Sequence, residues 1–224
     1  MNASTPLLLA SLIISTVSTH AQIVVFSFNG SVGNELTLAP DSQPSFATVT
    51  SMSRGSGLTP ASGADTFSAS AWTTSSSLDL SDYFSFYISP NNGALMSLYN
   101  LTLDERRSAS GIRDWSVRSS LDNFGTDLSH FSVPDDANTR TDQSTQLGTS
   151  FGNLLNGVEF RIYGYNSESG AGTWRIDNVR LAGNLSFSAV PEPREYALVV
   201  GAGLIAFAMV RKSKWGWRFG RMSS

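Results

Sequence analysis

Short segments with apolar residues at every second position are the feature that most restricts the fold of this sequence. Phe84, Phe86 and Ile88 alternate with their neighbours, and the same pattern returns between Val158 and Ile162. Because successive side chains of a β-strand point to opposite faces, each set predicts a strand with one face on a core. Clusters of Gly, Ser, Asn and Pro separate these segments, which is typical of an all-β sandwich.

Nine segments have this strand pattern, and we expect them to form one β-sandwich domain over residues 22–189. Two tight turns are predicted between them, at Pro90–Gly93 and Asn156–Gly157, because Asn and Gly readily adopt positive φ. The predicted strands are Ile23–Phe28, Phe46–Met52, Thr66–Trp72, Tyr83–Ser89, Met96–Leu103, Trp115–Ser120, Ser129–Val133, Val158–Tyr163 and Thr173–Leu181.

In the last predicted strand, the apolar residues change from one face of the strand to the other along its length. Trp174 and Ile176 share one face of an ideal strand, whereas Val179 and Leu181 share the other. A β-bulge near Asp177 would turn both pairs toward the core, because one extra residue switches the faces. This Trp-Arg-Ile-Asp-Asn-Val segment resembles the closing strand of jelly-roll domains in secreted bacterial proteins, which include many carbohydrate-binding modules. The resemblance implies a jelly-roll-like sandwich.

The composition excludes several classes of site. Residues 22–189 contain nine arginines, no lysine and 16 carboxylates, which gives 9 − 16 = −7. An acidic domain without basic clusters argues against nucleic acid as a partner. The chain has no cysteine, so disulfides, thiolate metal sites and cysteine nucleophiles are excluded. His130 is the one histidine of this stretch and no nucleophile motif accompanies it, so a Ser-His-Asp triad is not expected.

Carboxylates are the remaining groups that could bind a metal or move protons. Adjacent carboxylates occur at 104–105 and at 135–136. The pair at 135–136 is a poor glycosidase pair, because neighbouring side chains of a strand point to opposite faces. In the jelly rolls that the closing strand resembles, an acidic residue of that strand helps to bind a structural Ca²⁺ with groups near the start of the domain. The resemblance therefore implies a candidate calcium site with Asp177 and with Asn34 or Glu35.

Aromatic side chains offer a second kind of site, because flat rings stack on sugars. Trp115 and Trp174 are expected in the core, since aromatic residues dominate sandwich interiors. Tyr163 and Tyr165 lie near a predicted loop, and we expect them to be the exposed pair. The sequence thus predicts Tyr163 and Tyr165 as candidate ligand-binding aromatics, with extracellular polysaccharide as the candidate partner.

The N-terminus has the pattern of a signal peptide over residues 1–21. Leu7–Val17 is an apolar run that is too short to span a bilayer comfortably, and Thr19 and Ala21 are the small residues that a signal peptidase requires. We expect cleavage after Ala21. The alternative interpretation is a buried strand at the true N-terminus.

The C-terminus combines three elements in one order. Val190, Pro191, Glu192 and Pro193 come first, and the prolines keep this segment extended. Tyr196–Val210 is then an uncharged run that covers roughly 23 Å as a helix, less than the ~30 Å hydrocarbon core, so it can insert as one short transmembrane helix. A basic stop-transfer cluster follows, made of Arg211, Lys212 and Lys214.

This order resembles the PEP-CTERM sorting domain, which is also catalogued as the ice-binding protein C-terminal motif. The resemblance covers residues 190–214, and residues 215–224 extend it as a cytoplasmic tail. In that family an exosortase, a membrane enzyme similar to transpeptidases, processes the tail of exported proteins. The stretch from Gly33 to Leu181 also resembles an uncharacterised ectodomain that recurs with such tails. The resemblance implies anchoring in the inner membrane, then a place on the cell surface or outside the cell after processing.

Three function classes stay open from the sequence. The leading hypothesis is a non-enzymatic, exported cell-envelope or extracellular-matrix protein, because both terminal signals are present and no catalytic set or cofactor motif is. The alternative is a carbohydrate-binding module of jelly-roll type. An enzyme that acts on extracellular polymer through paired carboxylates comes third. A buried helix or an ordinary membrane-anchoring helix behind a proline-rich linker remains the alternative interpretation of the C-terminus.

Overall fold

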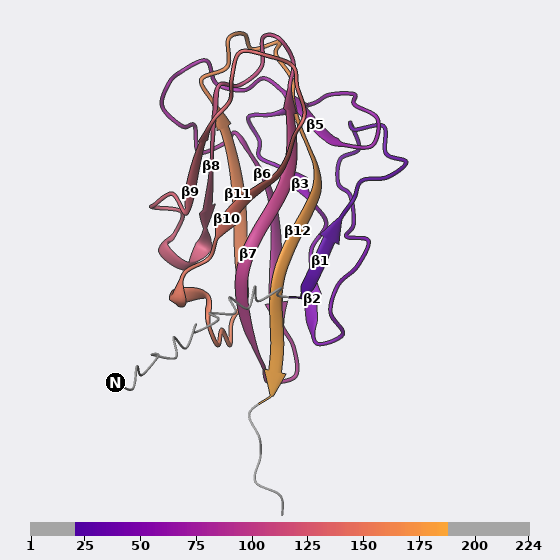
Figure 1. Ribbon diagram of the computed structural model, residues 1–224, viewed down its shortest axis with the longest axis vertical. Coiled ribbons are helices and arrows are strands. Elements are labelled where there is room, and N and C mark those ends of the chain that lie inside the picture. The colour runs from indigo at the N-terminus through magenta and orange to yellow at the C-terminus, as the bar shows by residue number, and fades with distance from the viewer. Residues whose placement is uncertain (1–20, 188–224) are drawn as a thin grey trace, which may run out of the picture. The chain divides into compact units, whose positions relative to one another are not determined.

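The computed structural model describes residues 21–187, which form a sandwich of two antiparallel β-sheets (Figure 1). The prediction of an all-β sandwich is confirmed. The predicted signal peptide, sorting motif, anchor helix and basic cluster lie outside the described residues. Within residues 21–187 there is no helix with the length and apolar character needed to cross a membrane.

The two sheets have six strands each among the described residues. The first has the order β10-β7-β12-β5-β4, with β1 also paired to β12; the second has the order β2-β6-β11-β8-β9, with β3 also paired to β6. The strands of the first sheet are β1 (Gln22–Phe26), β4 (Thr59–Pro60), β5 (Phe67–Ser70), β7 (Ala94–Arg107), β10 (Arg140–Gln146) and β12 (Trp174–Phe187). Those of the second are β2 (Ala47–Val49), β3 (Ser53–Arg54), β6 (Tyr83–Pro90), β8 (Asp114–Ser119), β9 (Ser129–Ser132) and β11 (Val158–Tyr165). Two 3₁₀ turns complete the fold, η1 (Ser120–Asp122) and η2 (Thr149–Phe151).

The core lies between the sheets and contains the residues that alternate in the sequence. Phe84, Phe86 and Ile88 of β6 are buried, and Phe86 lies opposite Phe160 of β11 across the strand ladder. Because the alternation has the period of the strand, every apolar residue of these segments reaches the same interior. The large buried apolar area this creates is the main stabilising contribution in a chain without disulfides.

Tryptophan rings form the centre of this core, as predicted for Trp115 and Trp174. The Trp174 ring centroid lies 5.3 Å from that of Trp72 and 5.7 Å from that of Trp115. All three side chains are at most 1% exposed. Tilted and edge-on contacts at such distances are favourable beyond simple area burial, so these rings fix how the two sheets face each other.

One of the two predicted turns is confirmed and the other is wrong. The turn at Pro90–Gly93 is present, with positive φ at Asn92 (56°) and Gly93 (75°). At Asn156–Gly157 neither residue has positive φ. That conformation belongs instead to Asn153 (54°). Gly157 is favoured for a different reason, because a Cβ atom at that position would lie 2.8 Å from the backbone carbonyl oxygen of Ile88 and would also collide with the Tyr87 side chain.

The predicted irregularity of the last strand is confirmed. Asn178 has φ 48°, and Trp174, Ile176, Val179 and Leu181 on either side of it are all at most 1% exposed. Because of the bulge, the apolar side chains before it and those after it all point into the core, as is expected when a strand contains one extra residue. Its physical cost is a left-handed residue within a strand, which Asn tolerates better than most residue types.

Strand β10 was not predicted from the sequence. Its residues are polar, and Thr145 is the one buried side chain among them. The strand lies at the edge of the first sheet and pairs with β7 alone. An edge strand that covers little of the core needs few apolar residues, so it leaves no hydrophobic period in the sequence.

Asp104 of β7 connects irregularities on both neighbouring strands. One carboxylate oxygen accepts a hydrogen bond from the backbone N–H of Asp142 at 2.8 Å, and the other accepts one from Nδ2 of Asn178, also at 2.8 Å. Asp142 has φ 53° and lies where the register between β10 and β7 shifts. Because β7 lies between β10 and β12, one nearly buried carboxylate holds two bulges at the same level of the sheet.

Replacing this carboxylate is expected to weaken the fold. Asp104→Ala should lower the free energy of unfolding by about 2–3 kcal/mol, because it removes a charged acceptor of two hydrogen bonds. Urea unfolding followed by tryptophan fluorescence measures the change. Asp142→Asn is the control: it keeps the backbone N–H and tolerates positive φ, and it loses only an exposed ion pair with Arg180, so we expect a change below about 1 kcal/mol. Equal losses in the two variants would show that Asp104 does not hold the bulges.

Candidate functional site

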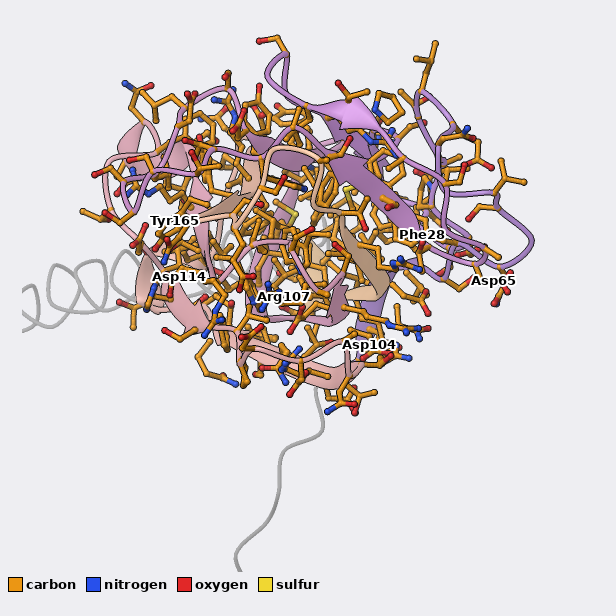
Figure 2. All side chains as sticks on the ribbon, turned by 90° about the horizontal axis from the view of Figure 1, so that it is seen from above. Phe28, Asp65, Asp104, Arg107, Asp114 and Tyr165 are labelled. Carbon is orange, nitrogen blue, oxygen red and sulfur yellow. The ribbon has the colours of Figure 1, made fainter. Side chains whose placement is uncertain are left out.

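A pocket of about 180 Å³ opens on the outer face of the first sheet, beside the bulges that Asp104 holds. Arg175 and Asp177 point outward into it because their neighbours Trp174 and Ile176 point into the core. Figure 2 looks down onto the end of the sandwich that is uppermost in Figure 1, and it shows Asp65 and Asp104 toward the same side. The pocket is lined by Ala64, Asp65, Thr66, Asp104, Glu105, Arg106, Thr139, Arg175, Ile176 and Asp177.

The carboxylates of the pocket are held in place by hydrogen bonds to the protein. Asp65 accepts a bond from the N–H of Gly30 at 2.7 Å, and Asp177 accepts one from the N–H of Asn178 at 2.6 Å. A carboxylate has about four acceptor positions. Asp65 and Asp177 are therefore oriented by the fold and still able to accept bonds from a ligand.

Burial raises the pKa of two of these groups. Burial, together with the carboxylates of Asp104 and Asp65, raises the pKa of Asp177 above its ordinary value. Burial also raises the pKa of Glu105, against the opposing effects of its bonds from Trp174 Nε1 at 2.8 Å and from Arg140 at 3.1 Å. The pocket thus concentrates negative charge that the protein neutralises only in part.

Arg175 differs from every other arginine between residues 21 and 187. Each of the other eight donates at least one hydrogen bond to a carbonyl or carboxylate oxygen. The Arg175 guanidinium has no such partner in this part of the chain, and its Nε atom is buried and unsatisfied. Burial and the nearby Arg106 guanidinium lower the pKa of Arg175. Because an unpaired buried donor is costly, this guanidinium is the group of the pocket with the most to gain from a ligand.

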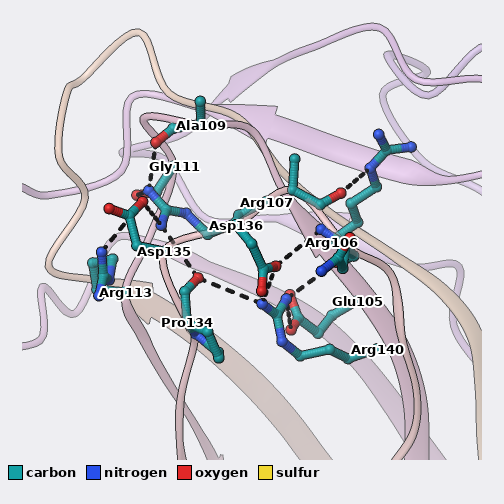
Figure 3. Close-up of polar contacts among 12 residues, drawn as sticks. Glu105, Arg106, Arg107, Ala109, Gly111, Arg113, Pro134, Asp135, Asp136 and Arg140 are labelled. Carbon is teal, nitrogen blue, oxygen red and sulfur yellow. Dashed lines mark hydrogen bonds and ion pairs between the residues drawn. The ribbon is translucent and has the colours of Figure 1, made fainter.

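A network of ion pairs holds the loops around the pocket (Figure 3). Arg140 connects Glu105 to Asp136, with N–O distances of 3.1 Å and 2.6 Å. Arg107 is completely buried and pairs with Asp135 at 3.1 Å. Asp135 also lies 3.4 Å from Arg113, so the acidic pair at 135–136, a candidate for chemistry from the sequence, is used to neutralise three arginines.

Among the candidate calcium ligands, Glu35 is bonded to its own loop. The Glu35 carboxylate accepts the backbone N–H groups of Val32 and Gly33 at 2.7 Å and 2.9 Å, and so closes its own loop. Among residues 21–187 no group of three or more His, Cys, Asp or Glu side chains has the arrangement of a metal site. Asp177 lies instead with Asp65 and Asp104, a grouping that the sequence analysis did not predict.

The expectation that Tyr163 and Tyr165 are exposed is wrong. They are 0% and 9% exposed, although both lie on the outer face of the second sheet. The loop after η1 folds back over that face, so that the Arg161 guanidinium lies 3.8 Å from the ring centroid of Phe124 and 4.4 Å from that of Tyr83. These stacked groups cover Tyr163, whose ring centroid is 5.4 Å from that of Tyr83. The two tyrosines therefore form no open platform for a sugar.

His130 lies on the same outer face, away from the pocket. Its Nε2 atom is 3.4 Å from Asp114, and the Asp114 carboxylate also accepts a bond from the hydroxyl group of Ser132. The serine is bound to the aspartate and not to the histidine, which is not the order of a Ser-His-Asp triad.

Comparison with known proteins gives distant structural similarities. No family model matches the chain, and no curated protein matches it. The structure of TmCBM61 in complex with β-1,4-galactotriose is similar over 62% of this chain and 90% of that one, with 12% identity and a TM-score of 0.28. The solution structure of CtCBM11 is similar over 76% of this chain and all of that one, with 13% identity and a TM-score of 0.29. At these TM-scores neither structure assigns a ligand to this chain.

The charge of Asp177 is expected to destabilise the native protein. Since its folded-state pKa lies above the unfolded value, the native state binds this proton more tightly, and stability is lost as the pH rises from the unfolded pKa through the folded pKa. Asp177→Asn should therefore raise the free energy of unfolding at pH 7, and the gain should vanish as the pH falls below about 4. Urea unfolding in chelator at both pH values tests this. A destabilised variant at pH 7 would contradict the assignment.

Proposed function

We propose that this chain is a non-catalytic envelope protein, exported and tethered by its C-terminus, whose sandwich binds a saccharide in the pocket around Arg175. The observation that carries the proposal is the unpaired Arg175 guanidinium beside the oriented carboxylates of Asp65 and Asp177. Each hydroxyl group of a sugar is both a donor and an acceptor. A guanidinium that donates, next to carboxylates that accept, can therefore form hydrogen bonds with neighbouring hydroxyl groups of one sugar ring.

The size of the pocket restricts the ligand. Pockets for drug-sized molecules have volumes of about 300–1,000 Å³, and this one has about 180 Å³. It therefore holds a single sugar residue, such as the end of a glycan chain, and not an internal stretch of several residues. The charged lining disfavours an apolar ligand, because its polar groups would lose water without gaining hydrogen bonds.

The charge of the pocket restricts the ligand further. Asp65, Asp104, Glu105 and Asp177 outnumber the two guanidinium groups of Arg106 and Arg175. A uronic acid or a sulfated sugar would bring another negative charge into a space where burial and like charge already raise the pKa of Asp177. Neutral sugars and amino sugars are thus the favoured ligands.

Export and tethering are supported by the order of the terminal signals. An apolar run before Ala21, and a Pro-Glu-Pro motif followed by an apolar run and cations, are the expected features of an exported protein with a PEP-CTERM-like tail. In this proposal the tail first anchors the protein in the inner membrane. An exosortase-type enzyme then acts at Val190–Pro193, and the sandwich reaches the cell surface or the extracellular matrix.

One observation favours a second candidate, an enzyme acting on extracellular polymer. Asp177 has a raised pKa in a pocket that also contains Asp65 and Asp104, and a general acid needs such a pKa. Both oxygens of Asp104, however, are bonded to the bulges. Release of reducing ends from a polysaccharide that the protein binds, abolished by Asp177→Asn, would favour the enzyme over the binding protein.

A glycan array tests the binding proposal. The detergent-solubilised full-length protein should bind a subset of neutral or amino glycans, and Arg175→Gln should weaken this binding at least tenfold, because a charged hydrogen bond to the ligand is worth about 1.5–3 kcal/mol. Arg180→Gln is the matched control. It lies on the same strand, and its partner is Asp142 outside the pocket. An array without signal, or equal binding by both variants, would refute a saccharide site at Arg175.

Replacing Pro191, Glu192 and Pro193 with alanines tests the sorting proposal. In the native host the variant should accumulate as a larger, membrane-retained product, because the motif that an exosortase recognises is missing. Immunoblots of membrane and extracellular fractions measure both properties. Identical size and release of the variant and the unaltered protein would contradict processing at this motif.

A further inference from the structure

The end of the sandwich at which β12 finishes carries no charged side chain among the segments that build it. These segments are residues 44–50, 90–97, 148–157 and 182–187, and none contains Asp, Glu, Lys, Arg or His. We call this part of the molecule the uncharged end. Figure 1 shows it as the lower end of the sandwich, where the arrowhead of β12 lies.

Hydrogen bonds show that these segments lie together. The N–H of Asn91 in the β6–β7 turn donates to the carbonyl oxygen of Phe46 at 2.8 Å, and Met96 and Leu154 exchange two backbone bonds of 2.9 Å and 2.7 Å. The backbone of Gly183 lies directly against that of Ser97, because a Cβ atom at position 183 would be 2.6 Å from the Ser97 carbonyl oxygen. The four segments, far apart in sequence, thus form one surface.

The uncharged end exposes large apolar side chains. Phe46 is 45% exposed and Leu155 is 68% exposed. Exposed leucines elsewhere have charged neighbours in sequence, as Leu36 follows Glu35 and Leu80 follows Asp79. Covering those leucines would also remove charges from water, which is costly. At the uncharged end an apolar phase can cover Phe46 and Leu155 without that cost.

The opposite end of the same strands is strongly charged. Strand β7 has 14 residues and spans roughly 44 Å from Ala94, at the uncharged end, to Arg107. Arg107 and its partners Asp135 and Glu168 hold the loops at that far end. The segments of the uncharged end therefore contrast with the opposite end of β7, where Arg107 and its ion-pair partners lie.

We propose that the uncharged end rests on the lipid bilayer, with Phe46 and Leu155 in its interfacial region. This inference rests on the proposed C-terminal tether. Eight residues, 188–195, separate β12 from the predicted anchor helix, and eight extended residues reach at most about 29 Å. The tether is thus shorter than the sandwich, so it keeps the uncharged end near the lipid. Because these four segments contain no Lys or Arg side chain, the contact does not need anionic headgroups.

This orientation presents the pocket to the outside. Arg175 lies one residue after the start of β12, and Asp104 lies near the far end of β7. Both positions belong to the end opposite the bilayer in this arrangement. A glycan approaching from outside would therefore meet the pocket first, while the apolar end faces the membrane.

Site-directed labelling tests the contact, because the chain has no native cysteine. Leu155→Cys and, independently, Phe46→Cys are labelled with an environment-sensitive fluorophore in the full-length protein, reconstituted into phosphatidylcholine vesicles. Leu36→Cys and Leu80→Cys are the matched controls. We expect at least a twofold higher emission at positions 46 and 155 than at the controls, and quenching of positions 46 and 155 alone by lipids with a headgroup nitroxide.

The outcomes separate this inference from the proposed function. Protein that does not float with the vesicles refutes the tether and, with it, the bilayer contact. Protein that floats but is quenched no more at positions 46 and 155 than at 36 and 80 refutes the bilayer contact alone. Emission that rises with the density of the protein in the vesicles and is not quenched by the nitroxide lipid shows that a second copy covers this end. That result also overturns the proposal.

Discussion

The single carboxylate of Asp104 is the constraint on which both the sheet and the pocket depend. It lies on the strand between β10 and β12 and accepts one hydrogen bond from each side, from Asp142 and from Asn178. Trp174 and Ile176 point into the core before the bulge at Asn178, and the bulge lets Val179 and Leu181 point into it as well. Without that change of parity, one end of β12 would turn its apolar residues to solvent.

The same irregularity explains why the pocket is polar and yet well ordered. Asp177 comes immediately before the left-handed residue, so its side chain is tied to the outer surface while the backbone turns. Glu105 comes directly after Asp104 and is buried beneath the pocket by Trp174 and Arg140. Buried polar groups with satisfied partners make a site rigid. Arg175 is the exception, and this difference is the reason for placing a ligand there.

The sequence predicts those features that a period or a residue type encodes locally. The alternation of β6 and β11, the bulge of β12 and the burial of Trp115 and Trp174 follow from parity and are present in the structure. Strand β10 has no apolar period because it is an edge, and the burial of Tyr163 depends on a loop from elsewhere in the chain. The outward direction of Arg175 follows from parity as well. Its lack of a partner, and the approach of Asp65 and Asp104, depend on contacts between distant strands and need the structure.

Strand β10 has a consequence for a protein displayed at high density. An exposed sheet edge offers unpaired N–H and C=O groups to the edge of another molecule, and long flat edges promote aggregation. Here the edge is polar, begins with the charged Arg140 and is bent by the bulge at Asp142. Crowded copies on one surface would therefore have difficulty in adding strands to each other's sheets. The residues that make β10 hard to recognise in the sequence keep neighbouring molecules separate.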